Sequence, residues 1–432
     1  MSIAGRHRVR VATFNVLSSH LSSPDYYTAC SSAALRQENR LRTCLKHKLQ
    51  AEVDQNAIIC LQEVSTLWAG KLHVFFEERD YCFFPAHYGR PFNGYMGVAM
   101  AWPRGLYQAE EVQISRIADT HSSWPSRQRG TAAGRVSTRL AWPSWVSSLR
   151  PLLPPVLLNL IAGFFGGGGG GRNARQRTQQ DMAPRDPVEE ARRRHNMAIV
   201  TRLMRVPEGA DGGRNMSANA TSGSEEAPPS MSTPPPSSTE QSFVVATYHM
   251  PCVFWAPQVM AIHTALLVQH VAASAAGRPF VLAGDFNFLP GSACYNLAVT
   301  GTMDPADPAY PHGAAIGSSR QGATGVEGDS ASESGQQWSP ETGLTLRSAY
   351  AEDNGHEPEF TNFAKVKDDP EFIGTLDYIF LGGREWRVDG TLPLPALGQV
   401  RSGGPFPTLN EPSDHLLIAA DLSLPSSKKP AE

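Results

Sequence analysis

Short apolar runs that end in acids, amides or imidazoles recur along this chain and limit the folds open to it. In the stretch VLAGDFN, residues 281–287, Asp285 and Asn287 stand directly behind a small apolar run. Both residue types compete with strand pairing, so they belong where a buried strand ends. In layered α/β proteins such strand ends gather along one cleft. The sequence therefore predicts an α/β fold with a polar cleft.

The apolar periodicity predicts strands and helices in alternation. In the first expected helix, Leu41, Leu45 and Leu49 recur four residues apart and so share one face. Helices are expected at about 34–53 and 257–275, and strands at 9–17, 57–64, 97–104, 197–205, 243–250, 279–287, 375–381 and 415–422.

Segments rich in Gly, Pro and Ser limit the length of the folded core. The chain has 432 residues, of which 38 are Gly and 34 are Pro. We expect flexible, disordered insertions at 105–195, 207–241 and 303–342. The remaining residues, roughly 280, suffice for one large domain. The prediction is a single domain over 7–424 and a disordered tail at 425–432.

The charge balance excludes a polyanion-binding surface that covers the whole molecule. The formal net charge is -3 and the pI is about 6.5, so a polyanionic substrate must be bound locally. The apolar run at 151–165 contains prolines and is shorter than the roughly 20 residues of a spanning helix. With the arginines that follow, segment 151–177 leaves two readings open, a flexible loop or a peripheral contact with anionic lipid.

The cysteines indicate a reducing compartment. They show no CxxC or zinc-type spacing, and several lie in apolar runs, as buried reduced thiols do. The basic N-terminal stretch lacks the long apolar core of a secretory signal. We expect a cytoplasmic protein, with a nuclear or mitochondrial destination still open. The six residues are Cys30, Cys44, Cys60, Cys82, Cys252 and Cys294.

Each polar residue at a strand end has a plain structural alternative when it is taken alone. Asn15 suits a turn, Glu63 a structural salt bridge, His249 a core histidine, and Asp285 with Asn287 an Asx turn. The carboxylate of Glu63 follows the run AIICL, where it would be desolvated without a cation or donor. The joint occurrence of these groups favours one shared site.

The residue types in this set suit the hydrolysis of phosphate esters. Glu, Asp and Asn oxygens are ligands for Mg²⁺, with Mn²⁺ as a substitute, whereas zinc would take more His or Cys. Phosphodiester hydrolysis needs a cation, an oriented water and donors to the phosphate oxygens. We expect Asp285 to activate the water, His249 and His415 to donate to phosphate, and Asp377 to hold the imidazole of His415.

The motifs TFNVL, CLQEV, TYHMP, GDFN, LDYIF and SDH, in this order, resemble those of the endonuclease/exonuclease/phosphatase superfamily of deoxyribonuclease I. The resemblance implies a four-layer α/β/β/α sandwich with two packed mixed β-sheets. It implies metal binding by Asn15 and Glu63 with Asp414 nearby. It also implies catalytic roles for His249, Asp285, Asn287, Asp377 and His415.

Within the superfamily, LRSAYAEDNGHEPEFTNF and GDFNFLPGSACYNLAVTG most resemble the branch of deadenylases, nocturnin, Angel proteins and 2',5'-phosphodiesterases. That resemblance implies that Phe372 stacks a base, worth about 1–3 kcal/mol, with core packing as the alternative. Asn362 and Tyr248 are expected to contact the substrate. Thr247 departs from the amide that usually stands at its position.

The sequence thus predicts a Mg²⁺-dependent phosphodiesterase that acts on nucleic acid, in particular a 3'-end exoribonuclease of deadenylase type on single-stranded RNA. One alternative keeps the chemistry and changes the substrate, as in a phosphoinositide phosphatase or a sphingomyelinase-like phosphoesterase. Another is a catalytically idle binding module. The sequence predicts no particular protein partner.

Overall fold

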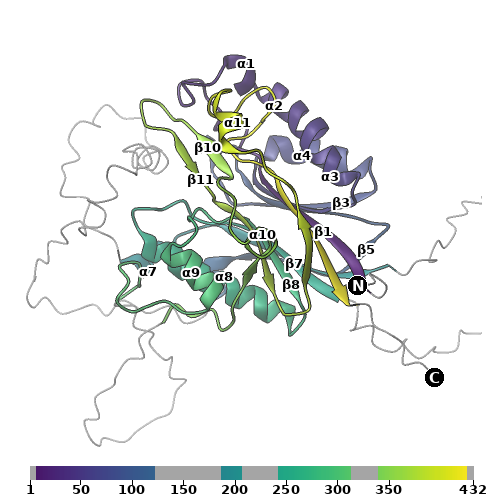
Figure 1. Cartoon of the computed structure of the whole chain (residues 1–432), viewed down its shortest axis with the longest axis vertical. Coiled ribbons are helices and arrows are strands. Elements are labelled where there is room, and N and C mark those ends of the chain that lie inside the picture. Colours follow the sequence, from purple (N-terminus) through teal and green to yellow (C-terminus); the bar gives the residue numbers. More distant parts are fainter. Residues whose placement is uncertain (1–5, 122–185, 207–241, 313–338, 426–432) are drawn as a thin grey trace, which may run out of the picture.

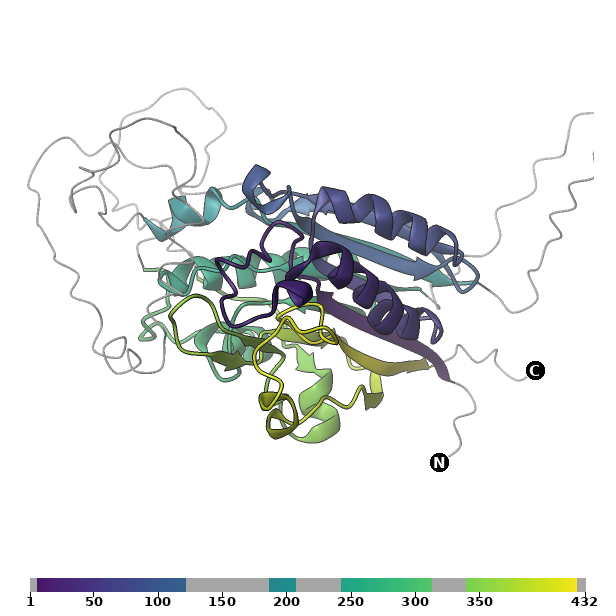
Figure 2. The same cartoon turned by 90° about the horizontal axis from the view of Figure 1, so that it is seen from above.

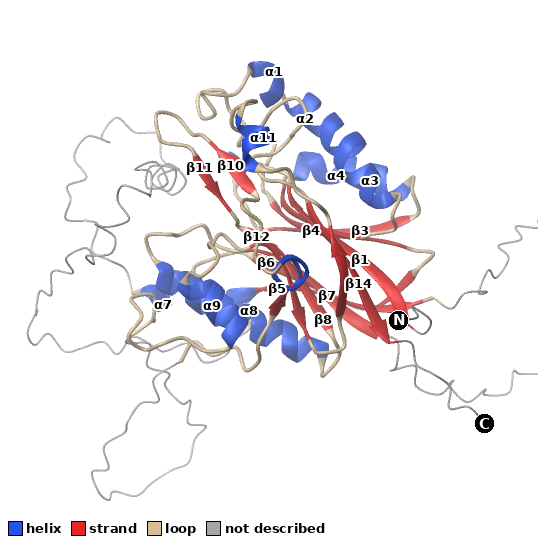
Figure 3. Cartoon of the chain, in the orientation of Figure 1, coloured by secondary structure: helices blue, strands red, loops and turns tan. Residues whose placement is uncertain are grey.

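The computed structural model describes residues 6–121, 186–206, 242–312 and 339–425. These residues form two six-stranded β-sheets that pack face to face, with helices on the outer faces (Figures 1 and 3). This is the α/β/β/α sandwich that the sequence predicted. The expected insertion 207–241, the expected lipid-contacting segment 151–177 and most of the tail lie outside the described residues.

Both sheets are mixed, because each contains one parallel pair among antiparallel neighbours. The parallel pairs are β1 with β2 and β7 with β8. In spatial order the first sheet is β13 (Arg387–Thr391), β14 (Ile418–Pro425), β1 (Arg6–Asn15), β2 (Ile58–Val64), β4 (Gly97–Pro103) and β3 (Tyr81–His87). The second is β5 (Tyr107–Arg116), β6 (Met197–Arg205), β7 (Ser242–His249), β8 (Phe280–Asp285), β12 (Asp377–Gly382) and β9 (Arg347–Ser348).

Helices cover the outer face of each sheet. Seen from above, the helices of the first sheet lie over its strands (Figure 2). They are α1 (Ser32–Leu35), α2 (Gln37–Thr43), the π-helical turn η1 (Cys44–Leu49), α3 (Gln50–Val53) and α4 (Thr66–Glu77). The second sheet is covered by α7 (Pro187–Arg192), α8 (Pro257–Ala275) and α9 (Ala293–Thr300). Among the described residues, no helix is both long and apolar enough to cross a membrane.

Shorter elements complete the end of the sandwich where the expected site residues lie. They are η2 (Pro91–Asn93), η3 (Ile117–Asp119), α10 (Ala349–Asn354), β10 (Asn362–Ala364), β11 (Phe372–Gly374) and α11 (Leu397–Arg401). Strands β10 and β11 pair as a small separate sheet. A bridge from Asn362 to His415 joins this small sheet to the segment that leads into β14.

Alternation along the strands divides the core into layers. On β8, Phe280 and Leu282 belong to the apolar cluster under α8, while Val281 and Ala283 belong to the cluster between the sheets. On β1, Val11 faces the second sheet, as successive residues of a strand point to opposite faces. This period of two determines which side chains reach the site at the strand ends.

Two of the expected insertions, 105–195 and 303–342, differ in their bounds from the structure. Strand β5 and helix α7 both lie within the insertion expected at 105–195, so the undescribed part of that range is 122–185. The insertion expected at 303–342 includes described residues on both sides of 313–338. The polar, charged pattern of β5 hid the strand, because five of its ten side chains are half-buried and four are exposed on the sheet edge.

Gly284 allows β7 and β8 to approach closely beside the expected site. A Cβ at this position would lie 2.0 Å from the carbonyl oxygen of Tyr248 on the paired strand. We predict that Gly284→Ala lowers the free energy of unfolding by about 1–3 kcal/mol, because the backbone must move. Urea denaturation followed by circular dichroism would measure this.

Gly70→Ala is the matched control, because Gly70 lies exposed in α4 with nothing within 4 Å of the added Cβ. Its stability should be unchanged or higher by up to about 1 kcal/mol. Equal stabilities of Gly284→Ala and the wild type would contradict the close approach of the strands.

Candidate active site

A cavity of about 470 Å³ lies at the end of the sandwich where the parallel strands finish. Asn15 ends β1, His249 ends β7 and Asp285 ends β8, while Asp377 begins β12 opposite Asp285. The cavity is lined by eight of the predicted residues, namely Glu63, His249, Asp285, Asn287, Asn362, Phe372, Asp414 and His415.

Asp285 lies at the centre of the polar groups. Its Oδ2 accepts a hydrogen bond from Asn15 Nδ2 at 2.9 Å. The same oxygen lies 3.5 Å from His249 Nε2 and 3.8 Å from His415 Nε2. The backbone N–H of Asn287 donates to Oδ1 at 2.9 Å, which is the Asx turn considered above. The turn and the shared site are therefore compatible, since each uses a different oxygen.

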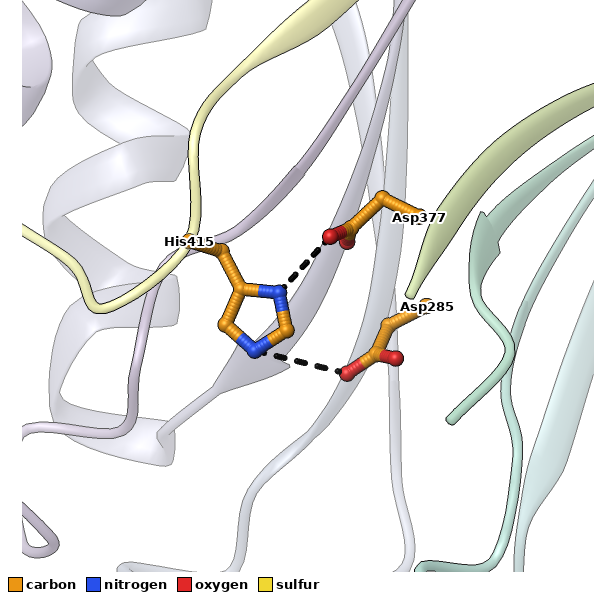
Figure 4. Close-up of side chains that lie close together, drawn as sticks. All are labelled: Asp285, Asp377 and His415. Carbon is orange, nitrogen blue, oxygen red and sulfur yellow. Dashed lines mark hydrogen bonds and ion pairs between the residues drawn. The ribbon is translucent and has the colours of Figure 1, made fainter. Parts of the chain in front are cut away.

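Asp377 holds His415 toward Asp285, as Figure 4 shows. Asp377 Oδ2 lies 2.8 Å from His415 Nδ1 and accepts a hydrogen bond from Thr361 Oγ1 at 2.6 Å. This contact directs Nε2 of the ring toward Asp285. Asp377 is therefore placed to hold the imidazole of His415, as expected. The catalytic roles of the two residues stay predictions.

Burial and mutual charge shift the pKa values of this cluster. Burial raises the pKa of Asp285, although the neighbouring imidazole of His415 opposes the shift. Burial alone would lower the pKa of His415, but the carboxylates of Asp377 and Asp285 outweigh it and hold that pKa well above its usual value. The arrangement therefore favours a charged His415 between two carboxyl groups.

A β-bulge turns Glu63 into the cavity. The pairing of β2 with β4 shifts between Leu61 and Val64, and Glu63 has a positive φ of 59°. Its carboxylate accepts from the backbone N–H of Ser18 at 3.0 Å and from Asn15 Nδ2 at 3.3 Å. Positive φ is uncommon in a non-glycine residue and persists where the surroundings fix the backbone. The salt bridge considered for Glu63 is absent among the described residues.

Asp414 is held at the cavity wall by neutral donors. Tyr27 Oη donates to its Oδ2 at 2.9 Å. The buried Arg40 donates instead to three carbonyl oxygens, those of Val16, Leu17 and Pro412, and so braces the loops behind the site. Neither Asp414 nor Glu63 forms an ion pair with a residue that the structure describes, which leaves two acids at one cavity without a counter-charge.

The donor set fits a hard divalent cation. Glu63, Asp285 and Asp414 line one cavity with carboxylate oxygens, and such groups need a cation when they are desolvated together. The carbonyl oxygen of Asn15 accepts a hydrogen bond from the N–H of Leu17 at 2.9 Å, and its second lone pair could bind an ion.

A second group, Asp285, Asp377 and His415, has donor atoms within 4.8 Å of one another. In that group His415 Nδ1 is already engaged by Asp377. Glu63 and Asp414 line the same cavity and offer the carboxylate oxygens that Mg²⁺ prefers, so they are the other candidate ligands.

Tyr248 does not reach the cavity, so its expected contact with substrate is wrong. The side chain is fully buried in the cluster under α8, and its hydroxyl lies 2.8 Å from His263 Nδ1. The reason is the period of two, since His249 faces the cavity and its neighbour must face the helices. Thr247 faces the other sheet, where its hydroxyl accepts from Gln62 Nε2 at 3.1 Å.

Phe372 and Asn362 both line the cavity, and their expected contacts with substrate stay predictions. Phe372 is half-buried on β11 and lines the cavity, which argues against pure core packing. Asn362 is 3% exposed, and its Oδ1 is a buried acceptor that receives no hydrogen bond from any described residue. Asp377 Oδ1 is another such acceptor. Unused acceptors at a cavity suit a ligand that donates hydrogen bonds.

The sequence analysis missed two residues that position His249. Tyr88 Oη lies 2.9 Å from His249 Nδ1, and Asn196 Nδ2 donates to the carbonyl oxygen of His249 at 2.8 Å. Tyr88 follows β3, a strand that the apolar pattern did not predict. Asn196 stands directly before a correctly predicted strand, β6, so its place at a strand end was the available signal.

Comparison with known proteins agrees with this geometry. Residues 12–415 match the model of the Endonuclease/Exonuclease/phosphatase family. The CCR4-Not complex 3'-5'-exoribonuclease subunit Ccr4 of Coccidioides immitis is 34% identical over 167 residues, 37% of this chain and 18% of that protein. Human 2',5'-phosphodiesterase 12 is 27% identical over 189 residues, 41% of this chain and 26% of the relative. These alignments therefore span only a small part of each relative.

A solved structure shares the whole architecture. ANGEL2, described as a 2',3'-cyclic phosphatase, superposes with a TM-score of 0.59 and 16% identity over 97% of this chain and 96% of that chain. At this identity the likeness concerns the fold. The expected fold, the superfamily and its deadenylase-like branch are confirmed. Because the match runs from residue 12 to residue 415, the chain belongs to the Endonuclease/Exonuclease/phosphatase family of phosphoester hydrolases.

Proposed function

We propose that this chain is a Mg²⁺-dependent phosphodiesterase that hydrolyses single-stranded RNA from the 3' end, as deadenylases do. The observation that carries the proposal is the convergence of Asn15, His249 and His415 on Asp285, which lines the cavity together with the two histidines. These groups come from both sheets, and no packing role requires so many buried polar side chains at one point.

Each side chain has a task that its contacts suit. Burial raises the pKa of Asp285 and makes it a stronger base than an exposed aspartate, so it takes the proton of the attacking water. His415, held at Nδ1 by Asp377, donates from Nε2 to a phosphate oxygen. His249, held at Nδ1 by Tyr88, presents its other nitrogen in the same way.

Asn287 orients the base through its backbone N–H, and its own amide is fixed by the carbonyl oxygen of Met250 at 3.0 Å. Glu63 and Asp414, with Asn15, would hold the cation. A bound Mg²⁺ neutralises charge that develops on the phosphate. Mn²⁺ has similar ligand preferences and is the natural substitute.

The names of the relatives support a nucleic-acid substrate. They include a 3'-5'-exoribonuclease subunit and a 2',5'-phosphodiesterase. Phe372 lines the cavity and offers a π face on which a base can stack. This feature favours unpaired nucleotides over a duplex.

The rival readings draw less support from the described residues. A phosphoinositide phosphatase or sphingomyelinase-like enzyme was suggested by segment 151–177, which lies outside them. Liposome co-sedimentation would test that membrane contact. The idle binding module is disfavoured because each catalytic position holds a competent residue. The cytoplasmic location expected from the sequence stays a prediction, which cell fractionation would test.

A substrate panel tests the proposal. We expect purified protein to shorten labelled oligoadenylate from the 3' end with Mg²⁺ and to stop when EDTA is added. The same gel assay includes mixed-sequence RNA, 2',5'-linked oligoadenylate, abasic DNA, a phosphoinositide and sphingomyelin. Cleavage of the lipids alone would replace the substrate class, and no cleavage of any ester would overturn the enzymatic proposal.

Asp285→Asn should reduce kcat by about 10²–10⁴-fold, because the amide cannot take a proton from water. Substrate affinity should change little, since the shape of the side chain is retained. Asp54→Asn is the matched control, because Asp54 is exposed at the end of α3, outside the cavity. Single-turnover kinetics would measure both, and full activity of Asp285→Asn would refute the assigned base.

Glu63→Gln should weaken Mg²⁺ binding by at least about tenfold, because it removes one ligand charge. Raised Mg²⁺ should partly restore activity. Isothermal titration calorimetry of Mg²⁺ binding to each variant distinguishes the two possible cation sites. If Asp377→Asn weakens Mg²⁺ binding and Glu63→Gln does not, the ion lies between Asp285, Asp377 and His415 instead.

A further inference from the structure

Two groups of opposite charge line the cavity, and the mechanism above uses only the acidic one. The other is a basic rim formed by Arg90, Arg193 and Arg194. Arg90 stands in the loop after β3, and the other two follow α7. Three arginines face the single glutamate of that part of the lining, Glu190, so the rim carries a positive excess.

The basic rim is anchored to the body of the protein. Arg116, at the end of β5, donates from Nε to the carbonyl oxygen of Arg194 at 2.8 Å and also to that of Arg192. His263 of α8 lies 3.0 Å from the carbonyl oxygen of Ala191. The rim therefore has a fixed backbone, as a preorganised binding site requires.

Contacts to His249 bring the rim next to the reacting centre. Tyr88, two residues before Arg90, contacts the imidazole of His249. Asn196, two residues after Arg194, donates to the backbone of the same histidine. Both halves of the rim thus attach to the His249 side of the site, while Glu63 and Asp414 belong to the proposed cation side.

Two of the rim charges, those of Arg90 and Arg193, are accessible to a ligand, whereas Arg194 is buried and forms an ion pair with Glu190. Arg90 is exposed and forms no ion pair with a described residue. Arg193 pairs with Glu189 on the surface at 2.5 Å, where both side chains are about half exposed, and such a pair contributes little and exchanges readily. The pKa of His195 is lowered by burial and then by Arg116 and Arg90, which is consistent with a positive potential here.

We propose that the basic rim binds a second, uncleaved phosphate of the substrate, one nucleotide away from the scissile bond. Guanidinium groups bind phosphate through paired hydrogen bonds. The basic rim is distinct from the proposed cation side, which consists of the acids Glu63 and Asp414. The inference rests on the proposed phosphodiesterase function and narrows its substrate to chains that carry at least two phosphates, in preference to single phosphate esters.

Short substrates that differ by one phosphate test this. ApA carries only the scissile phosphate, whereas pApA and ApAp add one on the 5' or 3' side. We expect the wild type to cleave at least one of the latter with about tenfold higher kcat/KM than ApA. Arg90→Gln should abolish that preference, and Arg192→Gln, on an exposed residue of α7 outside the cavity lining, should retain it. Equal cleavage of all three by the wild type overturns the inference and leaves the hydrolase intact.

Binding without catalysis separates the two proposals. Fluorescence anisotropy with labelled oligoadenylate in EDTA gives affinity as a function of salt. Arg90→Gln should make the slope of log K against log salt less negative by about 0.7, the value for one phosphate contact on a single strand. An unchanged slope, or no binding by the wild type, overturns the basic rim as a phosphate site. An Arg90-dependent slope in a protein that cleaves no nucleotide supports the rim and refutes the hydrolytic proposal.

Discussion

The hydrogen bond from Asn15 to Asp285 joins the two sheets at the site, and the rest of the arrangement depends on it. Asn15 ends a strand of the first sheet and Asp285 ends a strand of the second. The apolar cluster between the sheets holds both strands in place, with Val11 from one and Val281 and Ala283 from the other. Because Asp285 is 1% exposed, its charge must be balanced by neighbours rather than by bulk water. The site is thus a consequence of packing the sheets in this register.

Local backbone distortions convert ordinary strand ends into a site. Glu63 and Asn287 both have positive φ values, 59° and 52°, and both line the cavity. Such conformations cost of order 1–3 kcal/mol for a non-glycine residue and persist where the surroundings fix them. At Glu63 the bulge in β2 and the N–H of Ser18 do so, and at Asn287 the carbonyl of Met250 does so. The backbone conformation of these two residues turns the side chains of Glu63 and Asn287 toward the cavity.

Much of this could be predicted from sequence because the buried strands carry a strong pattern. Strand β6 and helix α8 have the expected bounds, and the polar residues at the ends of β1, β2, β7 and β8 converge as expected. The prediction for Tyr248 was wrong because Tyr248 stands next to His249 in the same motif, but successive strand residues point to opposite faces, so Tyr248 lies in the cluster under α8. Tyr88 was missed because β3, the strand that it follows, alternates only irregularly between buried and open positions. Side chains on edge strands and loops lack the apolar signal that locates the core.

The division between strands and loops also separates chemistry from selectivity in this molecule. The groups to which the proposed mechanism gives a role at the scissile phosphate stand at strand ends, where backbone pairing fixes them, as the pairing of His249 with Asp285 illustrates. Phe372 and Arg90 reach the cavity from short or irregular segments around it. Loops tolerate sequence change more readily than paired strands, so relatives with the same centre can differ in what they bind. A shared centre therefore identifies the bond that is broken, and the residues around its mouth select the molecule that carries the bond.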